Sequence, residues 1–354
     1  MYKILIINLG STSTKVAIYE NLDEVFSEKT SHSQDKINKY NSIWDQEDFR
    51  KKTVKNILHQ NDYTMDEFDV ISCRGGNVKP VSGGIYVLNK EMIEDMRSGK
   101  YGVHPTNVGN TIAYQLGKEA GIPVVIADPP VTDEFHDLAR FSGLKEISRM
   151  SSFHALNQKR TARKVAEDLR VNYEDINLIV AHLGGGISVA AHNKGKVIDV
   201  NNALDGDGPF SPERSGTLPV GDLIRMCFME DYSQEDMIKK VRGKGGLMSY
   251  LETNEAKKVV NRINNGDEYA KKVYHAMGYQ VAKEIGAAAT VLKGNVKRIA
   301  LTGGMAHSDM LTDWIIERVK FIAPVVIVPG ENEMLSLAEN ALRYLKGEEE
   351  PKEY

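Results

Sequence analysis

The sequence predicts an α/β protein built from two domains, and three observations support that class. The chain has 354 residues, a length typical of about two domains of ordinary size. Short apolar, β-branched runs alternate with longer segments of helical periodicity. A strand signal, a turn containing glycine and a second strand signal occur in this order twice, once at the start of each half. The two turns share no exact spacing, so they only suggest an internal repeat.

The first half opens with a predicted hairpin. A β-branched run over residues 2–7 leads into the polar segment 8–15, and a second apolar run covers residues 16–19. A strand, a polar turn and a strand in succession are typical of a β-hairpin. Residues 34–61 then have helical spacing, with one side formed by Ile43, Phe49, Val54, Ile57 and Leu58.

Two further strands are predicted in this half, and each ends at a polar residue. Residues 68–72 form a short apolar run that ends just before Arg74. Residues 122–127 form a second run, which ends at Asp128. Ligands of α/β proteins bind at the carboxyl ends of such strands, so both end residues are candidates for a site.

Helical periodicity returns between these strands, over residues 89–98 and 106–120. We expect Thr106 to be the N-cap of the second helix, because its hydroxyl can accept from a free backbone N–H group. Gly121 fits the C′ position at the other end, where a left-handed conformation is common.

The second half begins near residue 150. A predicted helix over residues 154–169 precedes a strand over 178–181, the turn from His182 to Ser188 and a strand over 189–192. A long helix is expected over residues 266–293. It is followed by a strand over 298–301 and a third glycine turn, Thr302 to Ala306, before another helix. The charged residues 347–354 are expected to fray.

Composition argues against several classes of function. The formal net charge of −4 gives no reason to expect nucleic acid or a membrane as a partner. The two cysteines, Cys73 and Cys227, have no zinc-ligand spacing and indicate reduced thiols. The apolar run Ile4 to Ile7 is too short for a signal peptide, and no run approaches the roughly 20 residues that span a bilayer. We therefore expect a soluble cytoplasmic protein.

The glycine-containing turns are candidate phosphate sites. Small residues in the segment Asn8 to Lys15 let backbone N–H groups approach an anion, while the hydroxyls and Lys15 add donors and charge. The alternative is an ordinary hairpin turn. Gly184, Gly185 and Gly186 each lose more entropy on folding than alanine, so close approach to a ligand would explain them, with a bulged hairpin as the alternative. The turn at Gly303 and Gly304 is weak evidence alone.

Four charged or titratable residues beside these turns are candidates for chemistry. Arg74 and Arg214 can each hold a carboxylate or phosphate, although a single arginine is more often a surface residue. Asp128 can order Mg²⁺ or orient a nucleophile, and the alternative is a local turn or cap. His182 adjoins the three glycines and can donate to a phosphoryl oxygen. His104 and His154 have the alternative of hydrogen-bonded structural histidines.

Three segments together resemble a known family. Residues 4–15, ILIINLGSTSTK, and residues 178–189, LIVAHLGGGISV, are similar to the two signature segments of the acetokinase family. Residues 209–216, PFSPERSG, fit its shorter butyrate kinase branch best. The resemblance extends to about residue 345.

The resemblance implies an actin-like fold, shared with sugar kinases, heat-shock chaperones and actin. Two ribonuclease-H-like domains, residues 1–150 and 151–333, would flank an interdomain cleft, with a helix at about 334–346 packed back on the first. The implied reaction is butanoate plus ATP giving butanoyl phosphate plus ADP, with Mg²⁺. The partners would be a short-chain carboxylate and its acyl phosphate, and the chain would form a homo-oligomer, at least a dimer.

The resemblance also implies roles for individual residues. The carboxylate and the phosphoryl group would be embraced by Arg74 and Arg214, with Asp128 and His182 as further catalytic residues and His104 at the acyl site. Glu333, with Asn8, would hold Mg²⁺ through water. The nucleotide would contact Asn8, Gly10, Ser11, Thr12, Lys15, Gly184, Gly185, Gly186, Gly303, Gly304 and Met305, with residues 253–255 also on the adenosine side.

This sequence departs from the family pattern at two positions. Gln158 stands where acetate kinases have a catalytic-site histidine, and Glu255 stands where an aspartate is expected. Two alternatives stay open at this point. The acid can be acetate, propionate or isobutyrate, because one methylene in an apolar pocket is worth only about 1–3 kcal/mol. A non-acyl actin-like ATPase is the second alternative.

Overall fold

The computed structural model describes residues 1–354, which divide into two compact units. Unit 1 comprises Met1–Thr132 and Asn332–Tyr354, and unit 2 comprises Asp133–Glu331. The sequence placed this boundary near residue 150, whereas residues 133–150 group with unit 2.

Local packing explains the position of the boundary. Phe135 shares a buried cluster with Phe153 and Val197 of unit 2. Arg149 pairs with Asp199, at 2.9 Å between Nη1 and Oδ1. Residues 133–150 are therefore attached to the second sheet through Phe135, Ala139 and Arg149, although most other apolar side chains of this segment are exposed.

Unit 1 is built on a six-stranded mixed sheet in the order β3-β2-β1-β4-β6-β5. β1 pairs antiparallel with β2 and parallel with β4, and β6 pairs antiparallel with the edge strand β5. The strands are β1 Lys3–Gly10, β2 Ser13–Glu20, β3 Asp23–Ser31, β4 Val70–Cys73, β5 Ile85–Val87 and β6 Val124–Ala127.

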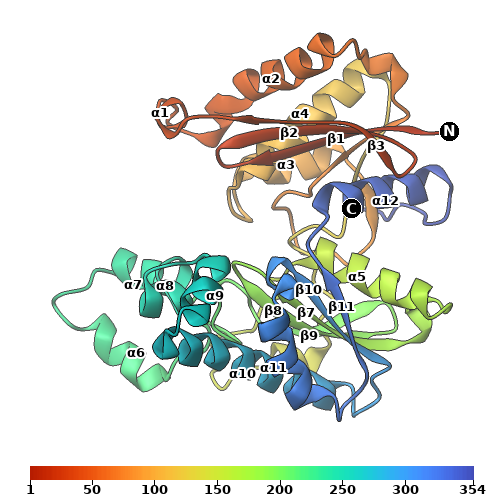
Figure 1. Cartoon of the computed structure of the whole chain (residues 1–354). Coiled ribbons are helices and arrows are strands. Elements are labelled where there is room, and N and C mark those ends of the chain that lie inside the picture. Colours follow the sequence, from red (N-terminus) through yellow and green to blue (C-terminus); the bar gives the residue numbers. More distant parts are fainter. The chain divides into compact units, whose positions relative to one another are not determined.

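Helices cover both faces of this sheet, because β1 is apolar on both sides. Leu5, Ile7 and Leu9 share a core with α2 and α4, and α12 packs against β1, β4 and β6 on the other side (Figure 1). The helices are α1 Gln34–Ile37, α2 Glu47–Gln60, α3 Lys90–Ser98, α4 Pro105–Ala120 and α12 Glu333–Leu345, with 3₁₀ turns Ile43–Gln46 and Met65–Glu67.

Two local predictions in unit 1 were wrong. The N-cap of α4 is His104 rather than Thr106, because Pro105 takes the first helical position, where its missing N–H costs nothing. The tail 347–354 does not fray, since Lys352 N donates to Ile85 O at 2.8 Å along the edge strand. The expectation that Gly121 ends α4 in a left-handed conformation is confirmed, with φ 72°.

Unit 2 is built on a five-stranded mixed sheet in the order β11-β10-β7-β8-β9. β7 pairs antiparallel with β8 and parallel with β10. The strands are β7 Asn177–Leu183, β8 Ile187–Asn193, β9 Lys196–Val200, β10 Arg298–Gly303 and β11 Val325–Pro329.

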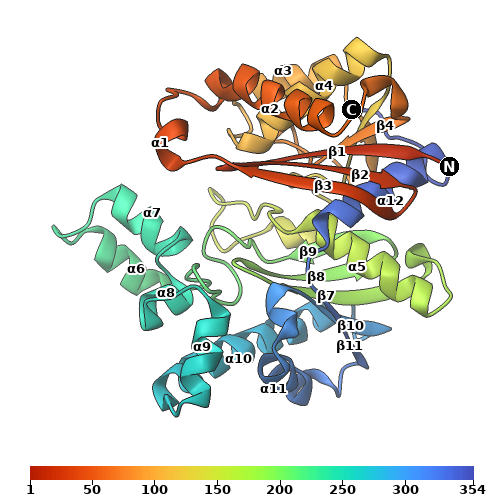
Figure 2. The same cartoon turned by 45° about the horizontal axis from the view of Figure 1, so that its top comes forward.

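The helices of unit 2 also cover both faces of its sheet. Leu178 and Val180 of β7 contact the α5 layer, whereas Ile179, Ala181 and Leu183 face α10 and α11 (Figures 1 and 2). The helices are α5 Ala155–Asp168, α6 Val220–Cys227, α7 Gln234–Arg242, α8 Gly246–Leu251, α9 Ala256–Asn264, α10 Glu268–Val291 and α11 Asp309–Val319, with 3₁₀ turns Asp137–Arg140, Tyr173–Asp175 and Gly304–His307.

The two units share one strand topology. In each, an antiparallel meander of three strands (β1-β2-β3 and β7-β8-β9) is extended by two parallel strands (β4-β6 and β10-β11) on the side of its first strand. The internal repeat that the two turns only suggested is therefore present in the topology. Unit 1 adds the antiparallel edge strand β5.

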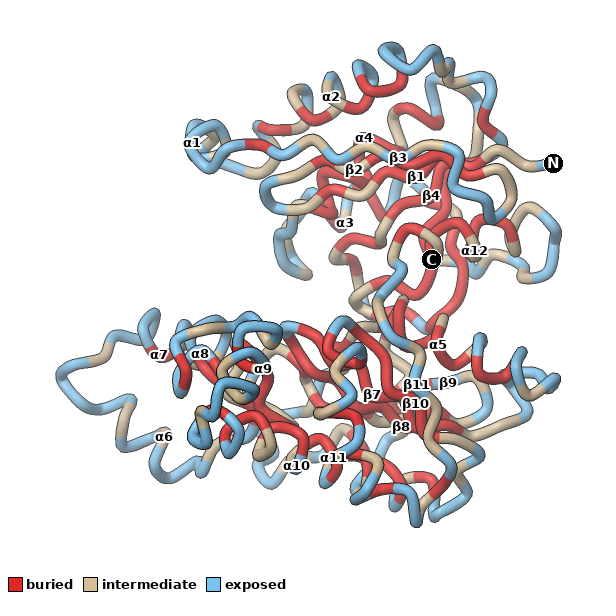
Figure 3. Tube along the Cα trace, viewed as in Figure 1, coloured by how far each residue is buried: buried red, intermediate tan, exposed pale blue.

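Burial is concentrated on the central strands of each sheet, whereas α6 contains no buried residue (Figure 3). No helix in the chain combines the length and the apolar composition that crossing a membrane requires.

Candidate active site

The predicted site residues form two groups, one in each unit, and both groups lie at the β-hairpin turn and at the carboxyl ends of neighbouring strands. In unit 1, Asn8 ends up on β1, Arg74 directly follows β4 and Asp128 directly follows β6. In unit 2, His182 lies on β7 and Gly303 ends β10. The two groups occupy equivalent places in their units because the two sheets share one strand topology.

The first turn is tighter than the polar segment 8–15 suggested. β1 runs to Gly10 and β2 begins at Ser13, so only Ser11 and Thr12 form the turn, and both are exposed. Asn8 and Lys15 are cross-strand partners in the ladder. The exposed hydroxyls and backbone N–H groups of this turn are available to an anion.

Arg50 of α2 binds the backbone carbonyls of this turn from the buried side, a role that the sequence analysis did not predict. Its guanidinium is 1% exposed and donates to Ser11 O and Ser13 O, each at 2.7 Å. Gln46 Oε1 and Thr14 Oγ1 accept further bonds. No carboxylate pairs with it, and burial lowers the pKa of the Arg50 guanidinium. The sequence signal that could have indicated a buried Arg50 is its position on the apolar stripe of α2, four residues before Val54.

Glu333 joins two predicted residues that are distant in the sequence. Its Oε2 accepts from Asn8 Nδ2 at 2.7 Å, and its Oε1 lies 3.2 Å from Arg74 Nη1. All three side chains keep partial access to solvent, with 42% of the Arg74 side chain and 31% of the Glu333 side chain exposed. The cluster therefore presents a guanidinium, a carboxylate and an amide at the surface of unit 1.

The loop that carries Arg74 is held by two buried asparagines of α4, which sequence reasoning also missed. Asn110 Nδ2 donates to Arg74 O at 2.9 Å, and Asn107 Oδ1 accepts from Asn77 N at 2.9 Å. The residue after Arg74 must be glycine, because a Cβ at position 75 would lie 2.4 Å from Pro129 Cβ. The backbone after β4 is thus fixed by side chains of the neighbouring helix and loop.

Asp128 is held in a left-handed conformation at the end of β6. Its φ is 44°, and its carboxylate is 1% exposed. Oδ1 accepts from Gly84 N at 2.9 Å, and the Asp128 N–H donates to Gly84 O at 3.0 Å. Non-glycine residues in this region are strained and are enriched at functional sites.

His104 combines a structural and an electrostatic feature. Its Nδ1 accepts from Thr106 N at 3.3 Å as the cap of α4, which leaves Nε2 as the donor of the neutral ring. Partial desolvation and the positive charge of Arg74 lower the pKa of His104. The ring is therefore a neutral Nε2–H donor at neutral pH, on the same side of unit 1 as Arg74.

The chain contains no group of three or more His, Cys, Asp and Glu side chains placed to hold a metal directly. The oxygen atoms of Glu333 and Asn8 are hard donors of the kind that Mg²⁺ prefers. Since Glu333 is already bound to Asn8 and Arg74, these residues fit an ion held through its own water shell.

The second turn, Gly184 to Gly186, is shaped by side chains that occupy the space of the missing Cβ atoms. A Cβ on Gly186 would lie 2.8 Å from Arg214 Nη1 and 3.1 Å from Ala203 O. A Cβ on Gly184 would lie 2.7 Å from His182 Nε2. The glycines thus let Arg214 and His182 lie directly against the backbone of the turn.

Arg214 is fixed in this position by its own loop. Its Nη1 donates to Ala203 O at 2.7 Å, and its backbone N donates to Ser211 Oγ at 3.2 Å. Ser211 Oγ in turn donates to Gly185 O at 2.5 Å. The buried Nε of Arg214 has no hydrogen-bond partner within the protein.

His182 has a defined proton on one ring nitrogen. Asn157 Nδ2 donates to the carbonyls of Gly330 and Glu331, so its Oδ1 must accept from His182 Nδ1, at 2.8 Å. His182 Nε2 is buried without a hydrogen bond and lies 3.4 Å from Glu331 Oε1. With its proton on Nδ1, the neutral ring presents Nε2 as an acceptor, so this buried nitrogen is suited to a ligand hydroxyl or, when the ring is doubly protonated, to a ligand oxygen.

His154 stacks on His182, and Gln158 belongs to the network beneath the pair. The two imidazole rings are 3.7 Å apart and nearly parallel, at 9°. Gln158 is fully buried. Its Nε2 donates to Ser188 O at 2.9 Å, and its Oε1 accepts from His192 Nε2 at 2.9 Å. Gln158 is thus a buried amide that bonds two residues of β8, Ser188 and His192.

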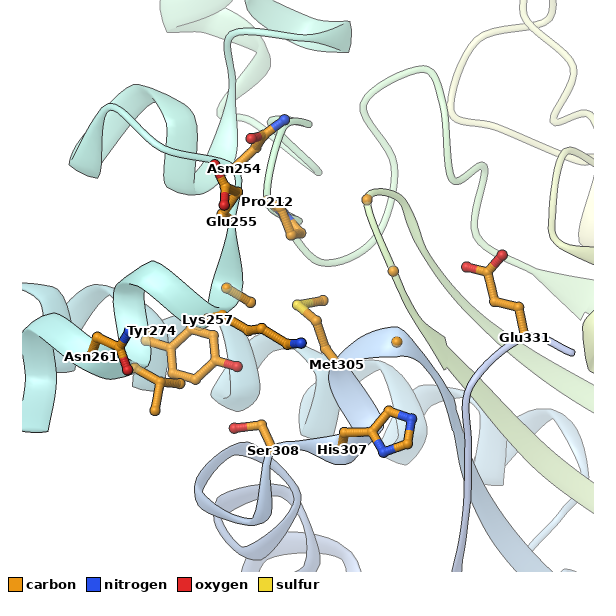
Figure 4. Close-up of a pocket in the computed structure, with 15 residues that line it drawn as sticks. Pro212, Asn254, Glu255, Lys257, Asn261, Tyr274, Met305, His307, Ser308 and Glu331 are labelled. Carbon is orange, nitrogen blue, oxygen red and sulfur yellow. The ribbon is translucent and has the colours of Figure 1, made fainter. Parts of the chain in front are cut away.

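A cavity of about 600 Å³ adjoins the second turn. Gly184, Gly185, Gly304 and Met305 line it together with Asn254 and Glu255, although these segments are far apart in the sequence. Figure 4 shows the Lys257 amine and the Tyr274 hydroxyl pointing into this space, with His307 and Ser308 below them. The pocket offers an apolar floor with a few polar groups, as nucleotide and cofactor sites do.

Solved structures match the fold over nearly the whole chain. An acetate kinase from Porphyromonas gingivalis superposes with a TM-score of 0.79 at 19% identity, covering 98% of this chain and 100% of that one. A propionate kinase from Francisella tularensis gives a TM-score of 0.75 at 17% identity, covering 96% and 99%. These likenesses establish the actin-like two-domain fold.

Sequence comparison establishes the family. "Butyrate kinase 2" of Clostridium acetobutylicum is 50% identical over 353 residues, which are 100% of this chain and 99% of the relative. The model of the acetokinase family matches residues 143–335. The chain belongs to the acetokinase family.

Proposed function

We propose that this protein is a butyrate kinase, which transfers a phosphoryl group reversibly from ATP to butanoate and yields ADP and butanoyl phosphate. The observation that carries the proposal is the 50% identity, over the full length of both chains, to the butyrate kinase of C. acetobutylicum. The arginines and glycine turns of each unit would supply the donors that this chemistry needs.

The acceptor needs no general base. A carboxylic acid has a pKa of about 4, so butanoate is already a nucleophilic anion at pH 7. Arg74 would bind this carboxylate, with the neutral Nε2–H of His104 as a second donor. Glu333 lies 3.2 Å from Arg74 and would orient its guanidinium before the substrate binds.

Arg214 and His182 would stabilise the charge on the transferring phosphoryl group. The unpaired Nε of Arg214 and Nε2 of His182 both belong to side chains that lie against the second glycine turn. Because Nδ1 of His182 donates to Asn157, donation from Nε2 requires the doubly protonated ring. Fixed donors of this kind are the main catalytic means in phosphoryl transfer.

The nucleotide would use donors from both hairpin turns. We assign its phosphates to Asn8, Gly10, Ser11, Thr12 and Lys15 of the first turn and to the three glycines of the second. The adenosine would occupy the 600 Å³ cavity beside Gly303, Gly304 and Met305. Mg²⁺, held through water by Glu333 and Asn8, would neutralise phosphate charge, and Asp128 would orient its water shell.

Coupled detection of ADP with butanoate, isobutyrate, propionate and acetate side by side tests the proposal. Hydroxylamine trapping should detect acyl hydroxamate, and butanoate should give the highest kcat/KM. A higher value for another acid would correct the substrate. ATP hydrolysis that is independent of any carboxylate, without hydroxamate, would instead indicate a non-acyl ATPase.

We also propose a homo-oligomer, at least a dimer. Val220 and Phe228, at the two ends of α6, are 66% and 85% exposed, and Ile224 between them is 52% exposed. An apolar surface of this kind is typical of an interface between protein chains. Light scattering coupled to size exclusion should give a multiple of 39.4 kDa, and a monomer would contradict this. The cytoplasmic location stays a prediction.

A further inference from the structure

The C-terminal tail, residues 347–354, extends the edge of the unit 1 sheet beside the strand β5. Lys352 N donates to Ile85 O at 2.8 Å, and Ile85 N donates to Glu349 Oε1 at 3.2 Å. Lys352 also forms a parallel bridge with Tyr86. The tail therefore satisfies the outward N–H and C=O groups of Ile85 on this edge strand.

The tail also encloses the glycine pair that precedes β5. The ammonium group of Lys352 donates to Gly83 O and, at 3.1 Å, to Ser82 Oγ. A Cβ on Gly84 would lie 2.7 Å from Lys352 Cε and 3.1 Å from Glu349 Oε1. Gly84, with φ 134°, is thus pressed against the tail in a conformation that only glycine adopts readily.

On its other side, Gly84 is the partner of Asp128. Gly84 N donates to Asp128 Oδ1 at 2.9 Å, and Gly84 O accepts from Asp128 N at 3.0 Å. The left-handed conformation of Asp128 persists only if its surroundings determine it. The surroundings include Gly84, which the tail contacts on its other side.

Tyr354 anchors the end of the tail. Its hydroxyl donates to Asp95 Oδ2 and accepts from Lys79 N at 3.1 Å. The Lys79 ammonium lies 3.9 Å from the centre of the Tyr354 ring. The last residue of the chain is therefore bound at three points to unit 1.

We propose that residues Glu349 to Tyr354 are a positioning element for Asp128, acting through Gly84. This rests on the proposed function, since the catalytic role of Asp128 belongs to it. The tail touches neither the acyl chain nor the nucleotide in this proposal. It sets the direction of the Gly84 N–H group, which donates to the Asp128 carboxylate.

The first experiment compares Lys352→Met with Lys346→Met in the full-length protein. Lys352→Met keeps the aliphatic stem but removes the donor to Gly83, so kcat should fall about tenfold while KM for ATP stays within about twofold. Lys346 lies at the end of α12 and pairs with Glu348, so its variant should retain kcat. An unchanged kcat in Lys352→Met would overturn the proposal.

A double-mutant cycle separates positioning from general stability. If the tail acts through Asp128, Lys352→Met should lower kcat little further in an Asp128→Asn background. Full additivity of the two losses would overturn the proposal.

Amide hydrogen exchange at Gly84 gives a readout that is independent of activity. Lys352→Met should accelerate exchange at Gly84 more than at the β1 amides, and equal rates in variant and wild type would overturn the proposal. A wild-type protein that forms no acyl phosphate would instead refute the proposed function.

Discussion

The two hairpin turns of the molecule occupy the same place in the same topology but are built in opposite ways. The first, at Ser11 and Thr12, has side chains that face solvent and is held from beneath by the buried Arg50. The second, Gly184 to Gly186, has no side chains of its own, and Arg214 and His182 fill the space instead.

This difference teaches how one topology can serve two tasks. A turn that keeps its hydroxyls can itself donate to an anion, provided that its carbonyl oxygens point away from the anion. In the first turn, Arg50 binds these carbonyl oxygens on the inner side. A turn reduced to glycine lets a charged side chain from a distant loop, here Arg214, lie against its backbone and reach an anion. The first turn is therefore expected to contribute mainly to binding, and the second mainly to transition-state stabilisation.

The largest expected effect is at the second turn. Arg214→Ala removes the guanidinium that we assign to the phosphoryl group, so kcat should fall about 10³-fold with little change in KM for ATP. Steady-state kinetics with butanoate measures this. Arg318→Ala is the matched control, since that side chain is exposed on α11 and its loss should leave kcat unchanged. Equal activity of Arg214→Ala and wild type would refute the assignment.

Gly186→Ala should have the next largest effect. The new Cβ would meet Arg214 Nη1 at 2.8 Å and displace it, so kcat/KM should fall about 100-fold although no charge is lost. Gly286→Ala in α10 is the control, because nothing lies within 4 Å of its Cβ. That change should instead stabilise the helix by about 0.5–1 kcal/mol. Full activity of Gly186→Ala would show that the turn tolerates a side chain.

At the first turn, Arg50→Met should weaken folding and binding more than catalysis. The change removes the donor to the Ser11 and Ser13 carbonyl oxygens. The free energy of unfolding should therefore fall by about 2–3 kcal/mol, and KM for ATP should rise. Urea denaturation and kinetics measure both quantities. Lys55→Met on the exposed side of α2 removes only a surface ion pair with Glu119, worth less than about 1 kcal/mol. A similar loss in both variants would contradict the role of Arg50.

The smallest effect concerns pH. His32 Nε2 is hydrogen-bonded to Thr14 of the first hairpin, and burial, then the charges of Arg50 and Lys36, lower the pKa of His32. The unfolded chain, with a histidine pKa of about 6.5, therefore binds more protons than the folded one below that pH. Stability should fall as the pH falls from 7.5 to 5.5, and His32→Gln should flatten this slope. The exposed His59→Gln is the control, and an unchanged slope in His32→Gln would contradict the prediction.

Much of the local structure could be predicted from the sequence. Both hairpins followed from apolar runs around polar or glycine turns, and α4 and α10 followed from their periodicity, because these signals lie within a few residues of one another. β3 was missed because it is a mostly exposed edge strand with charged residues along its length. Arg50 was missed because a charge on an apolar stripe has meaning only once its carbonyl partners are known.

The sequence by itself determined the fold class, the repeated strand and turn pattern and, through the resemblance, the family. Only the tertiary structure joined Glu333 to Asn8, which is 325 positions away, and the tail to Gly83, which is 269 positions away. The physical reason is that backbone propensity and periodicity act over a few residues, whereas such contacts depend on how the whole unit packs. A side chain's role at these points is set by neighbours that the local sequence does not contain.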